Sequence, residues 1–337
     1  MGKLHIYPRM DKIIGIGNAL TDVLVAMEDD ALLSRLRLPT GGMTLIDASR
    51  LAEIDASLKG LSHRISTGGS AANTIAALAH LRVQTGFVGK VGDDRYGRFF
   101  AESLGRQGTD GRLAISRGLP SGVAMTFISP DGERTFATHL GAAADLKAGD
   151  LSGEMFAGGL CLYVEGYLVQ DPAMMGRAMA LAKEAGLTIC MDLASYNVVA
   201  ANRDFFRRML AEQVDIVFAN EEEAKAFTGK EPCEALAELA GLCSIAVVKV
   251  GKRGSMVRKA QETVCVGAEH VEHVADTTGA GDFFAAGFLY GLTCGYSLER
   301  CARAGSLLAA YVIQTVGTTL SADKWDEIND RLQNNAF

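Results

Sequence analysis

The sequence predicts an α/β fold built on a mainly parallel sheet, with an additional β hairpin. From residue 160 onward, short apolar stretches typical of buried strands alternate with stretches typical of helices. This alternation indicates parallel strands joined by crossover helices. Near residue 276 a glycine turn runs into an almost wholly apolar helix, and between residues 123 and 138 two alternating stretches flank a turn. The second pattern predicts a hairpin.

The composition is that of a globular protein with a sizeable core. The chain has 337 residues, of which 48% are hydrophobic and 22% charged, and its formal net charge is −7. That charge argues against general affinity for nucleic acid, although a local basic pocket can still bind a small anionic substrate. Seven cysteines without a Cys-x-x-Cys pair indicate reduced thiols rather than disulfides or zinc. Without a signal-type or membrane-spanning stretch, we expect a soluble, cytoplasmic protein.

Residues 13–17 predict the first buried strand, which runs into a glycine turn. The turn begins like a dinucleotide-binding fingerprint, but Leu20 stands where the third glycine belongs. Asn18 and Asp22 follow the strand closely. From the residues alone, the first is a turn residue and the second a solvated loop carboxylate.

A second glycine cluster, Gly68-Gly69, precedes a predicted helix. Ser70 is the expected N-cap, because apolar residues then follow at helical spacing. Asn73 would lie near the helix start and reach the same pocket as the paired glycines. Its ordinary role there is to satisfy the local backbone.

The predicted hairpin has strands near residues 123–127 and 134–138 and a turn at Pro130-Asp131-Gly132. A further buried strand is predicted at residues 85–90. Together with residues from about 22 to 47, the hairpin would form a small β lid over the main domain. Closure of such a lid excludes water from the site below it.

The second half of the chain predicts the rest of the parallel sheet. Ligands gather at the carboxyl ends of such strands. Asn220 and Glu223 follow one strand, where acidic residues commonly act only as helix-dipole partners. Lys249, Gly251 and Gly254 surround a basic turn after the last strand. The predicted strands are residues 160–165, 188–192, 215–219 and 244–250, and the best-defined helix is Pro172–Glu184.

The glycine turn at Asp276-Thr277-Thr278-Gly279-Ala280-Gly281-Asp282 opens the apolar helix of residues 283–292. Small residues let a ligand approach the backbone closely. The N–H groups that open a helix have no partner inside it and lie at the positive end of its dipole, so they can bind a phosphate or a developing oxyanion. A carboxylate at position 282 could accept a proton from an attacking hydroxyl. Taken alone, such a residue is more often a cap.

These motifs together resemble the ribokinase (phosphofructokinase B) family of carbohydrate and nucleoside kinases. The turn before the apolar helix is similar to the family's C-terminal signature, and the Gly68-Gly69 cluster to its N-terminal signature. Resemblance extends from Gly17 to about Gly317. It implies one domain over residues 1–337: a ribokinase-like three-layer α/β/α fold with a parallel-rich central sheet. The lid would be formed by segments of about 22–47 and 113–142.

The resemblance implies an ATP-dependent phosphotransferase that moves the γ-phosphoryl group to a primary hydroxyl of a nucleoside or sugar. Asp282 would be the catalytic base, and Arg134 would fold onto the transferring phosphate, which suits its planar fork of donors. The anion hole would be the amides of Gly279, Ala280 and Gly281. The acceptor would contact Asn18, Leu20, Asp22, Gly68, Gly69, Asn73 and Tyr167, the last by stacking.

For the nucleotide, the resemblance implies Mg²⁺ and phosphate organised by Asn220 and Glu223, the latter acting through water. Lys249, Gly251 and Gly254 are assigned to a nucleotide-side loop. A potassium site at Asp276, Thr278 and the Gly317-Thr318 loop is a further hypothesis.

The acceptor remains open between branches of the family. The Asn-x-Leu-x-Asp spacing from Asn18, the lid segment, Gly166-Tyr167 and Asp192–Ser195 resemble the adenosine kinase branch, whereas the Lys252-Arg253 turn resembles ribokinase and other sugar kinases. The alternatives are a ribokinase- or fructokinase-type sugar kinase and a non-catalytic nucleoside- or sugar-binding module. A dehydrogenase is disfavoured by the missing third glycine. We expect a monomer or homodimer without nucleic-acid or membrane partners.

Overall fold

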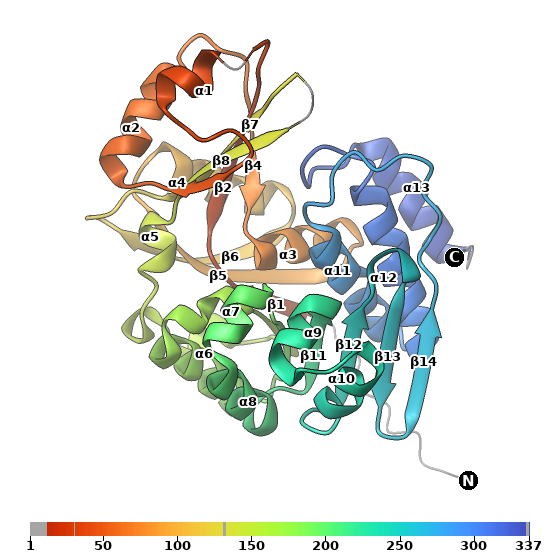
Figure 1. Ribbon diagram of the computed structural model, residues 1–337. Coiled ribbons are helices and arrows are strands. Elements are labelled where there is room, and N and C mark those ends of the chain that lie inside the picture. Colours follow the sequence, from red (N-terminus) through yellow and green to blue (C-terminus); the bar gives the residue numbers. More distant parts are fainter. Residues whose placement is uncertain (1–11, 30, 131–132, 335–336) are drawn as a thin grey trace.

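A large and a small β-sheet organise the computed structural model, which describes residues 12–29, 31–130, 133–334 and 337 (Figure 1). The large sheet has the order β14-β13-β12-β11-β10-β9-β1-β5-β6. All neighbours from β12 to β6 pair in parallel, as the alternation predicts, and β13 and β14 are antiparallel. The strands are β1 Lys12–Ile16, β5 Gln84–Gly92, β6 Thr109–Ser116, β9 Cys161–Glu165, β10 Thr188–Asp192, β11 Ile216–Asn220, β12 Ile245–Lys249, β13 Ser255–Lys259 and β14 Glu262–Val266.

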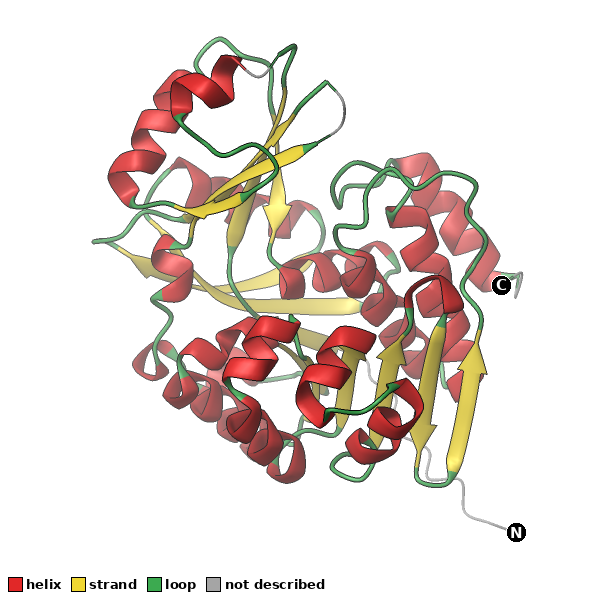
Figure 2. Cartoon of the chain, in the orientation of Figure 1, coloured by secondary structure: helices red, strands yellow, loops and turns green. Residues whose placement is uncertain are grey.

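Helices cover both faces of the large sheet (Figure 2). The first face is covered by α6 Pro172–Glu184, α7 Tyr196–Ala201, α8 Arg203–Glu212, α9 Glu221–Thr228 and α10 Pro232–Leu239. The second is covered by α3 Ser70–His80, α4 Arg95–Arg106, α11 Ala280–Thr293, α12 Leu298–Val312 and α13 Ala322–Gln333. Single turns connect these elements: α5 Gly141–Ala144, η1 Ala148–Asp150, η2 Gly153–Phe156, η3 Gly166–Gln170 and η4 Gly251–Arg253.

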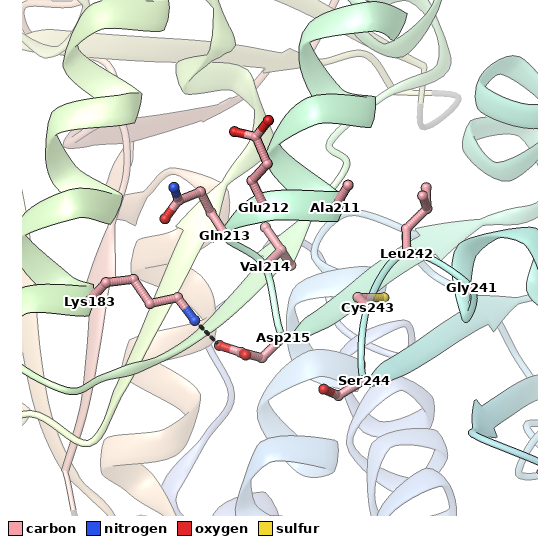
Figure 3. Close-up of a pocket in the computed structure, with 10 residues that line it drawn as sticks. All are labelled: Lys183, Ala211, Glu212, Gln213, Val214, Asp215, Gly241, Leu242, Cys243 and Ser244. Carbon is pink, nitrogen blue, oxygen red and sulfur yellow. Dashed lines mark hydrogen bonds and ion pairs between the residues drawn. The ribbon is translucent and has the colours of Figure 1, made fainter.

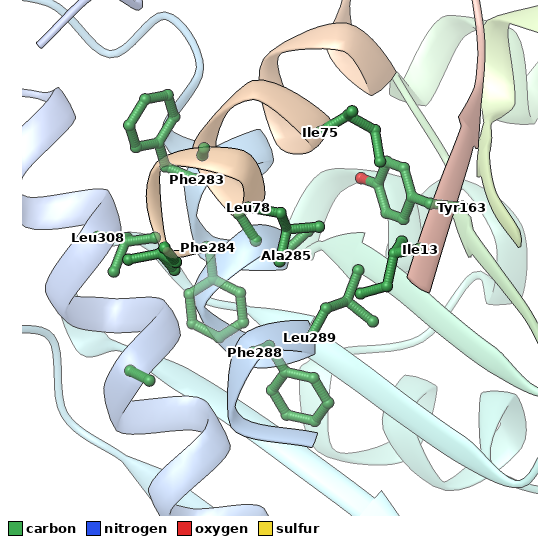
Figure 4. Close-up of a cluster of buried hydrophobic side chains, with 14 of the residues drawn as sticks. Ile13, Ile75, Leu78, Tyr163, Phe283, Phe284, Ala285, Phe288, Leu289 and Leu308 are labelled. Carbon is green, nitrogen blue, oxygen red and sulfur yellow. The ribbon is translucent and has the colours of Figure 1, made fainter. Parts of the chain in front are cut away.

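The core has one hydrophobic cluster on each face of this sheet. Side chains alternate along a strand, so Ile13 packs under α3 and α11 while Ile14 packs on the opposite face. Figure 4 shows Ile75 and Leu78 of α3 packed beside the apolar side chains of α11. A Cβ at Gly287 would lie 2.3 Å from a backbone oxygen of α12, so glycine lets these helices approach closely. This packing fixes the start of α11.

The small sheet has the order β3-β8-β7-β2-β4. The predicted hairpin forms its antiparallel β7–β8 pair, and Asp131-Gly132 of its turn lie outside the described residues. Two helices, α1 and α2, cover one face of this sheet. The elements are β2 Leu20–Ala26, β3 Met43–Leu45, β4 Arg64–Gly68, β7 Gly122–Ile128, β8 Arg134–His139, α1 Ala31–Leu36 and α2 Ala48–Ser57.

The small sheet differs in extent from the expected segments of 22–47 and 113–142. β4 belongs to it although the strand lies outside both, and residues 113–116 belong to β6 of the large sheet. β4 is an edge strand that is exposed at Arg64 and Ile65 and buried at Thr67 and Gly68, so no apolar alternation marks it in the sequence. β2 follows β1 after only three residues, which brings the small sheet to the carboxyl end of β1.

Candidate active site

Asp282, in the first turn of α11, is held by three side chains of α3. Its carboxylate accepts hydrogen bonds from Ser70 Oγ at 2.7 Å and from Asn73 Nδ2 at 2.9 Å. Thr74 Oγ1 donates to the Asp282 carbonyl oxygen at 3.2 Å. The prediction that Ser70 is the N-cap of α3 was wrong, because Gly69 takes that position and the Ser70 hydroxyl binds Asp282 instead.

The surroundings of Asp282 favour a base that works near neutral pH. Burial raises the pKa of Asp282 to about 6, although the hydrogen bonds from Ser70 and Asn73 lower it. The charge of Asp192 raises this pKa further, and Lys249 lowers it. At neutral pH the carboxylate is therefore ionised, yet it binds a proton more tightly than an ordinary aspartate.

The turn before α11 presents backbone N–H groups beside this carboxylate. Gly279 is its N-cap in the left-handed conformation, with φ of 76°. Ala280 N–H donates to the Thr277 carbonyl at 3.2 Å, so Ala280 departs from the expected anion hole. Within the described parts of the chain, the amides of Gly279 and Gly281 have no acceptor. A Cβ at Gly281 would lie 3.1 Å from Lys249 Nζ, so an ammonium group lies beside Gly281.

The expected acceptor residues lie next to Asp282. A Cβ at Gly68 would lie 2.1 Å from Asp22 Oδ1, and one at Gly69 would lie 2.1 Å from the Asn18 carbonyl oxygen. Both glycines thus permit close approach of chain segments. Burial raises the pKa of Asp22 to about 7, and the charge of Asp282 adds to that rise. The two signatures therefore meet at one place in the fold.

Leu20 and Tyr167 lie on different elements. Leu20 is two residues before Asp22 on β2 and shares its face of the small sheet. Tyr167 lies in η3 and is 37% exposed. Burial raises the pKa of its hydroxyl, and Ser195, which follows β10, partly offsets this rise. Tyr167 therefore lies between the carboxyl ends of β9 and β10.

Asn220 and Glu223 form a reciprocal cap at the start of α9. Glu223 N–H donates to Asn220 Oδ1 at 2.8 Å, and the Glu223 carboxylate accepts from Asn220 N at 2.8 Å and Nδ2 at 2.6 Å. Burial raises the pKa of Glu223 to about 7, with a further contribution from Asp192. Lys249 Nζ lies 2.9 Å from Asp192 Oδ2. Burial opposes the charge of Lys249, but Asp192 and Glu223 outweigh this and hold its pKa above the usual value.

Gly251 and Gly254 bound the turn that follows Lys249. Both have positive φ, 56° and 96°. A Cβ at Gly254 would lie 1.9 Å from the Val266 carbonyl oxygen, so this position requires glycine. Arg253 in the same turn pairs with Glu221 at the start of α9.

Arg134 of β8 reaches from the small sheet to the loop before α11. Its guanidinium lies 2.5 Å from Asp276 Oδ2 and 3.4 Å from Thr278 Oγ1. The Asp276 carboxylate also accepts from Thr278 N at 2.9 Å and from Gly317 N at 2.8 Å. Burial opposes ionisation of Asp276, but these donors hold its pKa below the usual value.

Residues 36–325 match the family model described as pfkB family carbohydrate kinase. The chain belongs to this family. It is therefore a phosphotransferase whose acceptor is a sugar or a nucleoside. The predicted membership of the ribokinase (phosphofructokinase B) family is confirmed.

Similar proteins include both sugar kinases and adenosine kinases. A 5-dehydro-2-deoxygluconokinase of Geobacillus thermodenitrificans is 28% identical over 79% of this chain and 84% of its own. A ribokinase of Arabidopsis thaliana is 28% identical over 90% and 76%. The structure of a probable sugar kinase from Rhizobium etli has a TM-score of 0.83 and 32% identity, covering 97% and 99%. Adenosine kinase from Sinorhizobium meliloti has a TM-score of 0.82 and 35% identity, covering 97% and 100%. These structures confirm the ribokinase-like fold.

PfkB kinases use ATP and typically Mg²⁺, and the groups at α9 suit a hydrated magnesium ion. Mg²⁺ prefers oxygen ligands and retains several waters. Asn220 and Glu223 are oriented by one another, with Asn220 Nδ2 2.6 Å from the Glu223 carboxylate. This donor set fits contact through water.

The arrangement at Asp276 does not fit the potassium hypothesis. Its carboxylate already accepts two backbone N–H groups and the Arg134 guanidinium. A monovalent cation at this carboxylate would be repelled by the guanidinium.

Two buried carboxylates of this pfkB kinase, Glu165 and Asp192, were not predicted from the sequence to be functional. Glu165 accepts a hydrogen bond from Asn18 Nδ2 at 2.7 Å, and Asp192 binds Lys249. Each is the last residue of a parallel strand, where ligands gather, and that position is the signal that could have identified them.

A hollow of about 320 Å³ lies at the other end of the large sheet (Figure 3). It is lined by residues that precede β11 and β12, including Asp215 and Ser244, and by Lys183 of α6. None of the candidate residues lines it. Among the helices in the described parts of the chain, none has the length and apolar character needed to cross a membrane.

Proposed function

We propose that this pfkB kinase transfers the γ-phosphoryl group of ATP to the primary hydroxyl of a nucleoside, in the manner of an adenosine kinase. The proposal depends mainly on the open face of the small sheet. Asp22 lies on that face in one row with Ala124, Thr138 and Leu45, each on a neighbouring strand. Met43 shares the face, and both Met43 and Leu45 are 64% exposed.

This face suits an acceptor with an apolar part. Leu45 is three strands from Asp22, or about 14 Å at the usual strand spacing. If Asp22 bound the hydroxyls of a bare pentose, the apolar surface at Leu45 would therefore remain uncovered. A nucleobase attached to the sugar can cover that surface. The carboxylates of Asp22, Glu165 and Asp282 disfavour an anionic acceptor such as a sugar acid. The 35% identity to an adenosine kinase also supports a nucleoside as the acceptor.

The chain's own groups suit the chemistry. Asp282 would accept the proton of the attacking hydroxyl, and the amides of Gly279 and Gly281 would stabilise charge that develops on the transferring group. Lys249 and Arg134 bring positive charge to the same turn. ATP would supply the phosphoryl group, and Asn220 and Glu223 would hold Mg²⁺ through water, which would offset the charge of the ATP phosphates. The small sheet would act as a lid that excludes water.

A sugar kinase is the second candidate, because the curated relatives are named as sugar kinases. The purified protein should be tested with ATP and Mg²⁺ for ADP release on adenosine, ribose, fructose and 5-dehydro-2-deoxygluconate. We expect the highest kcat/KM on adenosine. Turnover of a sugar without turnover of adenosine would favour the second candidate. Binding of adenosine without ADP release would favour a binding module.

A further inference from the structure

Glu165 is a buried carboxylate that joins three segments of the candidate active site. It ends β9 and is only 2% exposed. Its Oε1 accepts from Asn18 Nδ2 at 2.7 Å, and its Oε2 accepts from Ala71 N at 3.1 Å. A Cβ at Gly17 would lie 2.4 Å from Oε2. Gly17 therefore provides the space into which this carboxylate fits.

The segments that Glu165 joins have different tasks in the proposed reaction. Ala71 is in the first turn of α3, directly after Ser70, and the same turn leads to Asn73. Ser70 and Asn73 hold the Asp282 carboxylate. Asn18 lies in the connection between β1 and β2, which leads directly to Asp22. One buried side chain thus connects the segment that orients the base with the segment proposed to hold the acceptor.

The carboxylate also determines which way the Asn18 amide points. Both oxygens of Glu165 accept hydrogen bonds, Oε1 from Asn18 Nδ2 and Oε2 from Ala71 N, so the Asn18 amide presents its NH₂ group rather than its oxygen to Glu165. Asn18 Oδ1 is then directed away from Glu165 and can accept a hydrogen bond from an acceptor hydroxyl. Without the carboxylate, the amide could turn and present its NH₂ group instead.

We propose that Glu165 is a positioning residue. It fixes Asn18 relative to the start of α3, so that the acceptor hydroxyl is aligned with Asp282. This inference rests on the proposed function. Glu165 acts through Asn18 and Ala71 and does not itself touch the reacting atoms. A misplacement of about 1 Å in such an alignment can lower the rate about 100-fold.

The test compares Glu165→Ala and Glu165→Gln with Asp215→Asn. Asp215 Oδ2 accepts from Ile189 N at 2.8 Å and from Lys183 Nζ at 2.7 Å, far from the active site at the amino end of β11 (Figure 3). Its replacement removes the ion pair with Lys183 and controls for a merely structural effect. Michaelis constants for adenosine and ATP, kcat and Tm are measured for each variant.

We expect Glu165→Ala to raise the KM for adenosine about tenfold or more, the cost of losing a hydrogen bond to a charged group. Its kcat should fall while the KM for ATP stays within about twofold, because the α9 groups are untouched. Glu165→Gln should lie between Glu165→Ala and the wild type, since its amide oxygen can serve only one of the two donors. Asp215→Asn should lower Tm and leave the KM for adenosine unchanged.

The failure of this inference can be distinguished from failure of the proposed function. If the wild type turns over no acceptor, the proposed function fails, and calorimetric affinity for adenosine still tests Glu165. An unchanged KM or affinity for adenosine in Glu165→Ala or Glu165→Gln would overturn the inference. So would a parallel loss of adenosine and ATP binding in both variants, which would indicate a general structural defect.

Discussion

At the scale of single residues, Asp282→Asn tests the proposed base. The amide has nearly the same shape but cannot accept the proton, so we expect kcat to fall by about 10²–10⁴-fold with little change in Tm. In the wild type, kcat/KM should decline as pH falls through about 6, where burial places the pKa of this group. ADP release between pH 5 and 8 measures both effects. Near-normal turnover by a folded Asp282→Asn variant would exclude the assignment.

Gly279 gives a second residue test, because its backbone shape matters for the anion hole. A Cβ there would lie 2.5 Å from Thr318 Cγ2, and φ is 76°. Gly279→Ala must therefore displace the Thr318 side chain or the turn itself, and we expect kcat to fall about 100-fold or more as the amides lose their alignment. Gly295→Ala is the matched control, since Gly295 follows the same helix with φ of 71° and nothing within 4 Å.

Both glycine variants bear the strain of a side chain at positive φ, about 1 kcal/mol. Only Gly279→Ala also disturbs the candidate site. Equal kinetics for the two variants, measured as ADP release, would contradict a role for the Gly279 amide.

How far single residues could be predicted depends on whether the stretch around them carries a local signal. Asp282 and Asn73 lie in glycine-rich stretches, which indicate that the backbone is approached closely. In the structure a hydrogen bond connects the two side chains, which are 209 positions apart in sequence. Glu165 has no such local signal. Its partner Asn18 is 147 positions away, and only the parallel pairing of β9 with β1 brings them together.

At the scale of elements, Arg134 links β8 of the small sheet to the loop before α11. Arg134→Ala removes the ion pair with Asp276 and the contact with Thr278. We expect kcat/KM to fall about tenfold to 100-fold, because the sheet and the loop lose their charged contact. Arg134→Lys should recover only part of this loss, since an ammonium group lacks the planar fork that spans two partners. Steady-state ADP release measures the effect.

Arg98→Ala serves as the control for Arg134. The Arg98–Asp93 pair is 3.5 Å long with both side chains well exposed, and such surface pairs contribute little. Its kinetics should match the wild type. If Arg134→Ala also matched the wild type, the contact between sheet and loop would have no part in catalysis.

Elements with strong periodicity could be predicted, whereas those determined by distant contacts could not. Helix α6 has its predicted bounds, Pro172–Glu184, because it combines an N-terminal proline with an apolar stripe. Strand β4 has neither feature, since its position depends on pairing with β2. The N-cap of α3 was misplaced because the Ser70 hydroxyl binds a residue 212 positions away.

At the scale of the whole molecule, the alternation of strands and helices predicted the class of the sheet but not its order. β1 lies inside the sheet, third from the β6 edge, between β9 and β5. This order concentrates buried carboxylates at one edge. Burial raises the pKa of Asp22, Glu165 and Glu223 to about 7 and that of Asp282 to about 6.

Because of these four groups, we expect the stability of the fold to decrease as pH rises, whereas activity should increase. Between about pH 5 and 7 the native state binds more protons than the unfolded chain, whose carboxyl groups titrate near 4. The free energy of unfolding should therefore fall as pH rises through this window, by about 1.4 kcal/mol per pH unit for each excess proton. Burial lowers the pKa of His80, which opposes the trend by at most one proton.

Thermal unfolding should thus show a higher Tm at pH 5.5 than at pH 7.5, while kcat/KM rises over the same range as Asp282 ionises. Glu223→Gln removes one of the titrating groups and keeps a side chain that can accept from Asn220, so it should flatten the pH dependence of Tm. Glu234→Gln, in the exposed first turn of α10, is the control and should leave the slope unchanged. A Tm that rises with pH between 5.5 and 7.5 would contradict the argument, because it would mean that the buried carboxyl groups are ionised in the native protein throughout this range.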